Sequence, residues 1–196
     1  MKIIGVTGGV GAGKSTVLDI LKKEYGAQIL LADEIGKELM EPGKTCFQPV
    51  IDAFGKQIVD KEGRLDRRKI SEIVFKDKTE LERLNAIIHP AVQKEIELRL
   101  EYFRSAGSSL SVIESAILIE AGYEEICNEI WYIYVTSEKR IQRLMESRGY
   151  TREKCLEIMD NQLADEEFRR SAAVVIDNGG TVEETKEQIA SFLSIC

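Results

Sequence analysis

One lysine and one serine close a run of glycines near the amino terminus, in the segment GVTGGVGAGKSTVL at residues 5–18. Residues 8–15 read GGVGAGKS and match the pattern G-x-x-x-x-G-K-[ST] at every position. Glycines let successive backbone N–H groups approach an anion without Cβ collisions. In such a loop the lysine reaches the β- and γ-phosphates, and the hydroxyl ligates Mg²⁺. The pattern therefore predicts a loop that binds a nucleoside triphosphate, with Lys14 on the phosphates and Ser15 on the metal.

The residues predicted to contact the nucleotide belong to this loop and to the start of the next helix. A helix presents its positive amino-terminal end to a bound anion. The predicted set is Gly8, Gly9, Gly11, Ala12, Gly13, Lys14, Ser15 and Thr16. A turn that only packs a helix on a strand is the plain alternative. A Rossmann-type turn would leave the lysine and the serine unexplained.

A carboxylate follows the second predicted strand, because Asp33 comes directly after AQILLA at residues 27–32. The carboxyl ends of parallel strands line the ligand crevice of an open α/β sheet. Asp33 could there accept the proton of an acceptor hydroxyl and orient that hydroxyl toward the γ-phosphate. It could equally be the N-cap of the helix EIGKELM, since Asp is favoured at that position. Position alone leaves both interpretations open.

The elements that position these residues alternate between strand and helix. Strands are predicted at 2–6, 27–32, 109–115, 129–136 and 172–178, and helices at 14–25, 137–148, 151–170 and after 181. Such alternation indicates a three-layer α/β fold whose five-stranded parallel sheet is covered on both faces. Between strands two and three the pattern is almost all helical, broken at 41–43 and 60–66, and we interpret this block as an insertion.

Several helix ends carry their own signals. Asp66 and Asp77 are predicted N-caps, and Pro90 suits the first turn of another helix. Thr181 and Glu184 form a predicted capping box for the last helix.

Composition limits the function further. The 196 residues have a formal charge of −7 and a pI near 5.0, which disfavours broad electrostatic binding of nucleic acid. Apolar runs stay far below the ~20 residues needed to cross a bilayer. Four scattered cysteines fit reduced thiols, and the single histidine excludes sites that need two. We therefore expect a cytoplasmic enzyme without membrane or nucleic-acid partners, and the sequence leaves its oligomeric state unknown.

A phosphate loop alone does not separate a switch, a motor and a kinase. The sequence lacks the N-K-x-D motif of guanine-binding switches, and the D-x-x-G match at 52–55 sits in helical sequence. Glu114, at the end of the strand SVIE, is either the acidic residue that motor ATPases carry there or an ordinary inner-sheet residue. Small size, one phosphate loop and a helical insertion favour a kinase for a small acceptor.

Five ordered segments resemble the dephospho-CoA kinase family over nearly the whole chain. They are VTGGVGAGKST, ILLADEIGKELMEPG, GRLDRRKISEIVF, LNAIIHP and VVIDNGG, within residues 5–180. The resemblance implies ATP-dependent phosphorylation of the ribose 3′-hydroxyl of dephospho-coenzyme A, with Mg²⁺. It also implies a P-loop kinase fold with a nucleotide-binding core at about 1–34 and 108–196, a helical acceptor-binding insertion at about 35–107 and a lid at about 138–165.

The resemblance also assigns roles to single residues. The catalytic aspartate of the family falls on Asp33, and the lid arginine on Arg143, which would cover the transferring phosphoryl group. The basic cluster GRLDRRK at 63–69 could receive the acceptor's pyrophosphate, with Arg64 as the predicted contact. His89 is predicted to face the acceptor, and a hydrogen-bonded histidine at a helix start is the alternative. Asn178, just past the last strand, is placed near the adenine by its strand-end position.

The sequence departs from the family pattern in three places. The family often reads D-A-D where this chain has LAD at 31–33, so only the second acidic residue remains. The stretch AILIE at 116–120 lacks the family's proline. In the lid, Gly149 replaces an aspartate after one extra residue, which bears on Arg148 more than on Arg143. Another small-molecule kinase of this fold, such as a nucleoside monophosphate or shikimate-type kinase, remains the alternative, as does a nucleotide-dependent switch.

Overall fold

The computed structural model describes residues 1–193, so Cys196 lies outside the described residues. The chain forms two compact units. The sheet unit comprises Met1–Leu30 and the chain from Phe103 onward, and the helical unit comprises Leu31–Tyr102. Each unit is described by itself below.

The sheet contains five strands in the order β2-β3-β1-β4-β5 within the described residues. The pairs β1–β3, β1–β4 and β4–β5 are parallel, and Val6 pairs with both Glu114 and Trp131. The strands are β1 (Lys2–Thr7), β2 (Gln28–Leu31), β3 (Leu110–Glu114), β4 (Glu129–Tyr134) and β5 (Val174–Asp177). The five strands predicted from the sequence are therefore confirmed, with ends that differ by one or two residues.

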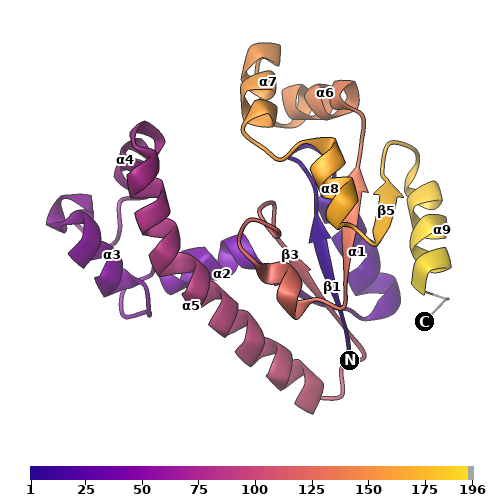
Figure 1. Cartoon of the computed structure of the whole chain (residues 1–196), viewed down its shortest axis with the longest axis horizontal. Coiled ribbons are helices and arrows are strands. Elements are labelled where there is room, and N and C mark those ends of the chain that lie inside the picture. Colours follow the sequence, from indigo (N-terminus) through magenta and orange to yellow (C-terminus); the bar gives the residue numbers. More distant parts are fainter. Residues whose placement is uncertain (194–196) are drawn as a thin grey trace. The chain divides into compact units, whose positions relative to one another are not determined.

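Alternate side chains along the strands build the two covered faces. On one face, Ile4 and Trp131 are fully buried and pack with helices α1 (Lys14–Tyr25) and α9 (Val182–Leu193). On the other, the Tyr132 ring stacks on Phe168 of α8 (Asp165–Ser171) at 4.9 Å, and α8 lies in front of the strands in Figure 1. Burying a large side chain contributes roughly 1.5–3 kcal/mol, so both faces stabilise the sheet. The result is the predicted three-layer arrangement.

The region after β4 differs from its prediction. Helix α6 (Ser137–Arg148) has the predicted bounds, but the helix expected over 151–170 is two helices, α7 (Arg152–Asp160) and α8. The residues between them leave the helical path because the Ala164 N–H bonds to the Glu167 carboxylate, which starts α8 afresh. Helices α6 and α7 pack through Ile141, Leu144 and Cys155.

The helical unit contains α2 (Ala32–Leu39), α3 (Phe47–Phe54), the short 3-10 helix η1 (Lys56–Ile58), α4 (Arg67–Lys76) and most of α5 (Lys78–Ser105). These helices bury Val50, Ile58 and Ile96 completely. Helix α2 carries Gly36 at its contact with α5, where an added Cβ would meet Ile88 and Val92 at 3.5 Å. The helical block predicted between strands two and three is confirmed.

The predicted helix signals are mostly found. The Asp66 carboxylate accepts from the N–H groups of Arg68 and Lys69, and Thr181 and Glu184 bond reciprocally as a capping box. Asp77 accepts from the Thr79 N–H at the start of α5. The prediction for Pro90 is wrong, because it lies inside the 28-residue helix α5. A proline there removes one helical N–H, and the buried residues on both sides of it hold the helix together.

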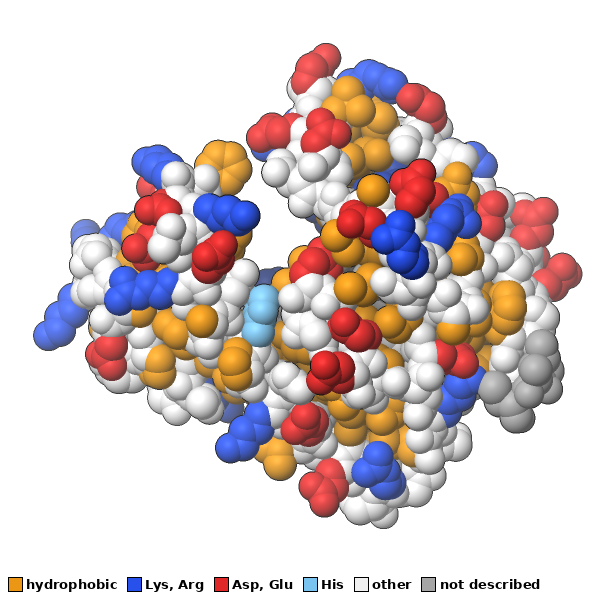
Figure 2. All heavy atoms as spheres, in the orientation of Figure 1, with side chains coloured by type: hydrophobic (Ala, Val, Ile, Leu, Met, Phe, Trp, Pro, Cys, Tyr) orange, Lys and Arg blue, Asp and Glu red, His pale blue; other side chains and the backbone are white. Residues whose placement is uncertain are grey.

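Two further properties concern the helices and the surface. Among the described helices, each is too short or too polar to span a bilayer. On the face shown in Figure 2, basic and acidic side chains are interspersed in both units.

Candidate functional site

The glycine loop connects β1 to α1 in the sheet unit. Gly11 and Gly13 have φ values of +85° and +80°, a backbone conformation that favours glycine. Gly13 is the N-cap of α1 and supplies no side chain to cap it. The first turn of a helix has N–H groups without helical partners, and these groups attract anions. The local backbone therefore suits phosphate binding.

Lys14 lies across this loop. Its Nζ donates to the carbonyl oxygen of Gly8 at 2.8 Å and lies 3.4 Å from Glu114 Oε1. The side chains of Lys14 and Glu114 are only 15% and 14% exposed, so the pair is well shielded from water. Glu114 is the last residue of β3, and the structure thus brings this acidic candidate beside the loop lysine.

Arg140 of α6 holds the loop from one side. Its Nε donates to the carbonyl oxygen of Val10 at 2.9 Å, and its Nη2 donates to Gln162 Oε1 at 2.6 Å. The same Gln162 oxygen accepts from the Val10 N–H at 3.1 Å. A Cβ on Gly9 would overlap the Arg140 guanidinium, so a side chain at position 9 would displace Arg140 from these hydrogen bonds. Burial lowers the pKa of Arg140, yet a guanidinium stays protonated in proteins.

Arg143, one turn further along α6, contacts the other half of the loop. Its Nη1 donates to the carbonyl oxygen of Ala12 at 3.3 Å, and its Nη2 donates to that of Asn178 at 2.8 Å. The predicted lid arginine therefore lies against the loop. Arg148, at the end of α6, instead lies 5.9 Å from the ring centroid of Tyr150.

Asn178 lies directly after β5, where its side chain contacts the loop. Its Nδ2 donates to the carbonyl oxygens of Ala12 at 2.8 Å and Gly13 at 3.2 Å. Its Oδ1 accepts from the hydroxyl of Thr185 in α9 at 3.1 Å. Asn178 is 5% exposed, so its carboxamide is committed to the loop and to α9.

Asp33 belongs to the helical unit. It is exposed in the first turn of α2, two residues after the end of β2. Because Leu31 is the N-cap, the structure does not support the alternative in which Asp33 caps this helix. The carboxylate is therefore left without that structural role.

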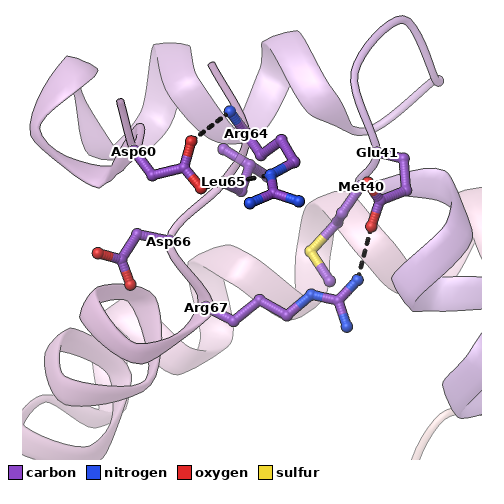
Figure 3. A pocket seen from close by; sticks show the side chains of 7 residues that line it. All are labelled: Met40, Glu41, Asp60, Arg64, Leu65, Asp66 and Arg67. Carbon is purple, nitrogen blue, oxygen red and sulfur yellow. Dashed lines mark hydrogen bonds and ion pairs between the residues drawn. The ribbon is translucent and has the colours of Figure 1, made fainter. Parts of the chain in front are cut away.

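A cavity of about 450 Å³ opens in the helical unit at the predicted basic cluster. Figure 3 shows the Arg64 guanidinium pointing into this space, with Asp60 on one side and Met40 on the other. The Arg64 Nε lies 3.5 Å from the Asp60 carboxylate, whose pKa is lowered mainly by the hydrogen bond from the Arg64 N–H. Arg67 pairs with Glu41 at 2.8 Å. Two arginines thus line one cavity, each beside a carboxylate.

His89 is half-buried in the interior of α5, and burial lowers its pKa, which favours the neutral imidazole at pH 7. Seven residues line the cavity of Figure 3, and His89 is not one of them. The alternative that placed His89 at a helix start is wrong for the same reason as for Pro90.

A family model for dephospho-CoA kinase matches residues 2–184 of the chain. This chain belongs to the dephospho-CoA kinase family. Two relatives named dephospho-CoA kinase match nearly the full length. The protein from Carboxydothermus hydrogenoformans is 42% identical, over 98% of this chain and 93% of its own. The protein from Geobacter sulfurreducens is 39% identical, over 96% of this chain and 95% of its own.

Solved structures share the fold of this chain. The crystal structure of TT1252 from Thermus thermophilus is 30% identical with a TM-score of 0.86, covering 99% of this chain and 96% of that one. The dephospho-CoA kinase from Campylobacter jejuni is 22% identical with a TM-score of 0.70, covering 99% and 96%. A shikimate kinase from Acinetobacter baumannii, 21% identical, has a TM-score of 0.55 and covers 100% and 94%. The last two show the shared P-loop kinase fold alone.

Sequence reasoning missed two side chains of this dephospho-CoA kinase family member. Thr185 lies four residues before Ile189 on α9, and a polar residue at a buried position of an amphipathic helix was the available signal. Gln162 lies in the break between α7 and α8 and contacts a residue 152 positions earlier. A contact of that kind leaves no local pattern in the sequence.

Proposed function

We propose that this chain transfers the γ-phosphoryl group of ATP to the ribose 3′-hydroxyl of dephospho-CoA, giving CoA and ADP. The observation that carries the proposal is a complete phosphate loop, with Lys14 held between Gly8 and Glu114, in a chain of this family. In the transfer, the acceptor oxygen bonds to the γ-phosphorus while the bond from that phosphorus to the β,γ-bridging oxygen breaks.

The loop binds the polyphosphate of ATP in this proposal. The N–H groups of residues 8–16 surround the phosphates, and Lys14 neutralises charge on the β- and γ-phosphates. Charge spreads over the equatorial oxygens of the transferring group in the transition state, so positive groups that are already in place stabilise it. Lys14 is such a group, because two contacts fix its ammonium beside the loop.

Mg²⁺ fits the oxygen donors of this loop. Ser15 in the first turn of α1 is the proposed ligand, and the Glu114 carboxylate offers a second oxygen donor in the same region. Mg²⁺ prefers oxygen ligands and is usually bound by one or two protein groups plus substrate phosphates. Within residues 1–193 no group of three or more His, Cys, Asp or Glu side chains is placed to hold a metal ion. When bound, the ion neutralises phosphate charge.

Asp33 is the proposed group that orients the acceptor. Its carboxylate accepts a hydrogen bond from the 3′-hydroxyl and takes the proton as the new P–O bond forms. Support comes from its place after β2, which neighbours β3 in the sheet, and from its exposure without a capping role. Family resemblance at LAD adds to this.

Arg143 is the proposed arginine over the transferring group. Arg140 and Arg143 of α6 both contact the loop, but they are not equivalent. Both side chains are half-buried, but Arg140 has two short hydrogen bonds of 2.9 and 2.6 Å, whereas Arg143 has one of 2.8 Å to Asn178 and a long one of 3.3 Å to Ala12. A long bond to a carbonyl oxygen is easily exchanged for a phosphate oxygen, because charge-assisted hydrogen bonds are stronger. Arg143 therefore suits the role better than Arg140.

The cavity of Figure 3 is the proposed site for the pyrophosphate of the acceptor. Arg64 and Arg67 line it, and arginine matches phosphate oxygens bidentately. Their partners are surface carboxylates, and exposed ion pairs contribute little to stability, so phosphates can replace them. His89 remains a proposed acceptor contact, with a neutral ring that can donate or accept a hydrogen bond. The cytoplasmic location also remains a prediction.

A coupled assay of ADP release tests the whole proposal. Purified protein is given ATP and Mg²⁺ with dephospho-CoA, AMP, CMP, shikimate or no acceptor. We expect turnover with dephospho-CoA at least about a hundredfold above every other condition, since a site built for one acceptor's polar groups rejects analogues strongly. Turnover with another acceptor would favour the alternative kinase, and equal ADP release without acceptor would favour a nucleotide switch.

A further inference from the structure

A buried polar pair lies behind the phosphate loop. Asn178 is 5% exposed and Thr185 is fully buried, although both carry polar side chains. They come from different elements, since Asn178 follows β5 and Thr185 lies in the first turns of α9 (Figure 1). Burying polar groups is costly unless their hydrogen bonds are satisfied, so the contacts of this pair need an explanation.

The Asn178 carboxamide fixes two peptide units of the loop. Its Nδ2 donates to the carbonyl oxygens of Ala12 and Gly13. In a trans peptide the C=O and N–H point in opposite directions. Holding these two carbonyls toward Asn178 therefore turns the N–H groups of Gly13 and Lys14 away from Asn178. Those N–H groups belong to the stretch that the phosphates of ATP would occupy.

The glycine at position 13 allows this contact. A Cβ there would overlap Asn178 Nδ2, so the carboxamide would have to move away from the loop. Gly13 is therefore needed for the approach of the carboxamide as well as for its φ of +80°. The contact of the Asn178 side chain with the loop therefore depends on the glycine at position 13.

Thr185 fixes which end of the carboxamide faces the loop. A primary amide can rotate by half a turn and exchange its oxygen for its nitrogen. The Thr185 hydroxyl has one proton, which it shares between Asn178 Oδ1 and the carbonyl oxygen of Thr181, both at 3.1 Å. Donation to Oδ1 favours the orientation in which Nδ2 faces the loop. In the reversed orientation, Oδ1 would face two carbonyl oxygens and repel them.

We propose that Asn178 and Thr185 are positioning residues that hold the phosphate loop in its ATP-binding conformation, with Thr185 acting only through Asn178. This inference rests on the proposed role of the loop in binding ATP. It replaces the expected contact between the Asn178 side chain and the adenine with an indirect role.

Matched substitutions at Thr185 test the proposal. Thr185→Val keeps the shape and removes the hydroxyl, whereas Thr185→Ser keeps the hydroxyl and removes only the methyl group. The dissociation constant of ATP is measured by titration calorimetry, and the KM of dephospho-CoA by the coupled assay. Because one hydrogen bond is worth about 0.5–1.5 kcal/mol, or a factor of about 2 to 13, we expect about fivefold weaker ATP binding in Thr185→Val. Thr185→Ser should bind ATP within about twofold of wild type, and the acceptor KM should not change in either.

A second pair of variants distinguishes an effect on ATP binding from a general loss of stability. Ser111→Ala also removes a fully buried hydroxyl from the sheet unit, in β3, and should lower the melting temperature without changing ATP affinity. Asn178→Asp keeps the shape but replaces the Nδ2 donors with an oxygen that faces two carbonyls. We expect at least tenfold weaker ATP binding in this variant. If Thr185→Val does not fold, Thr185→Ala is compared with Thr185→Ser in the same way.

The outcomes separate this inference from the proposed function. Wild-type ATP affinity in Thr185→Val, or equal losses in the valine and serine variants, would overturn the positioning role. A loss in Ser111→Ala as large as in Thr185→Val would do the same, because it would trace the effect to stability. Wild-type protein that binds ATP but leaves dephospho-CoA unphosphorylated would overturn the function while the titrations still decide the inference. Wild-type protein that binds no ATP would overturn both.

Discussion

The phosphate loop and the arginine-lined cavity hold their charged groups in contrasting ways. At the loop, Arg140, Arg143 and Asn178 donate to backbone carbonyl oxygens, and Lys14 is 15% exposed. At the cavity, the side chains of Arg64 and Arg67 are 59% and 51% exposed and pair with surface carboxylates. Both regions carry basic side chains that are proposed to bind phosphates, so the two regions differ in how firmly these side chains are held in place.

The contrast separates a preorganised site from an adaptable one. Hydrogen bonds to buried backbone groups are costly to break, because each leaves a carbonyl unsatisfied. Exposed ion pairs are screened by water and salt and are cheap to exchange. The comparison therefore predicts large effects for substitutions at the loop and small, acceptor-specific effects at the cavity.

The largest effect is expected at Lys14. Lys14→Ala removes the ammonium beside the phosphates and leaves the shielded Glu114 carboxylate without this partner. We expect kcat/KM to fall about a thousandfold, as for loss of one preorganised charge-stabilising group, and ATP to bind more weakly. Lys22→Ala, on the exposed face of the same helix, is the control. Near-normal turnover in Lys14→Ala would remove the loop from the reaction.

Replacing Asp33 should lower the rate of phosphoryl transfer without changing the affinity for ATP. Asp33→Asn keeps the size and removes the proton acceptor, so kcat should fall at least about a hundredfold. Calorimetric titration should give an ATP affinity close to that of wild type. Glu34→Gln, the exposed neighbour in the same helical turn, should retain wild-type kcat. If Asp33→Asn turns over normally, the carboxylate has no part in orienting the hydroxyl.

Two of the three arginines of α6, Arg143 and Arg148, extend the comparison. Arg143→Ala removes a guanidinium that contacts the loop, and we expect kcat to fall about tenfold to a hundredfold with a smaller change in the KM of ATP. Arg148→Ala, at the end of the same helix, should stay within about twofold of wild type. Equal losses in the two variants would indicate that α6 acts through its net charge.

The smallest effect is expected at the cavity. Arg64→Ala should raise the KM of dephospho-CoA about tenfold, since it removes one charge-assisted contact to phosphate, and leave ATP affinity unchanged. Arg68→Ala is the matched control, because its side chain is 88% exposed in the same segment. The effect of Arg64→Ala should shrink at high salt. An unchanged acceptor KM would place the pyrophosphate elsewhere.

Local patterns predicted much of this molecule. The helix at 14–25 was predicted with its observed ends, because the loop glycines precede it and Gly26 ends it in a left-handed conformation. The Asp66 cap was predicted because its partners lie two and three residues away. Pro90 misled the prediction, since a proline normally marks a helix start and only tertiary packing explains one inside α5.

The long-range contacts could not be predicted from the sequence. Lys14 and Ser15 were identified from spacing, yet the pairing of Lys14 with Glu114 depends on β1 and β3 being neighbours in the sheet. Gln162 and Thr185 gave no motif, because a glutamine in a helix break and a threonine in a helix are common. Their contacts exist only after distant segments pack together.

Because Gly9 has no side chain, the residues at positions 9 and 140 depend on each other although they are distant in the sequence. The volume that a methyl group would fill there belongs to the Arg140 guanidinium. A descendant of this chain that acquired alanine at residue 9 would therefore have to move or shorten the side chain at residue 140, and the Val10 carbonyl would then need another partner.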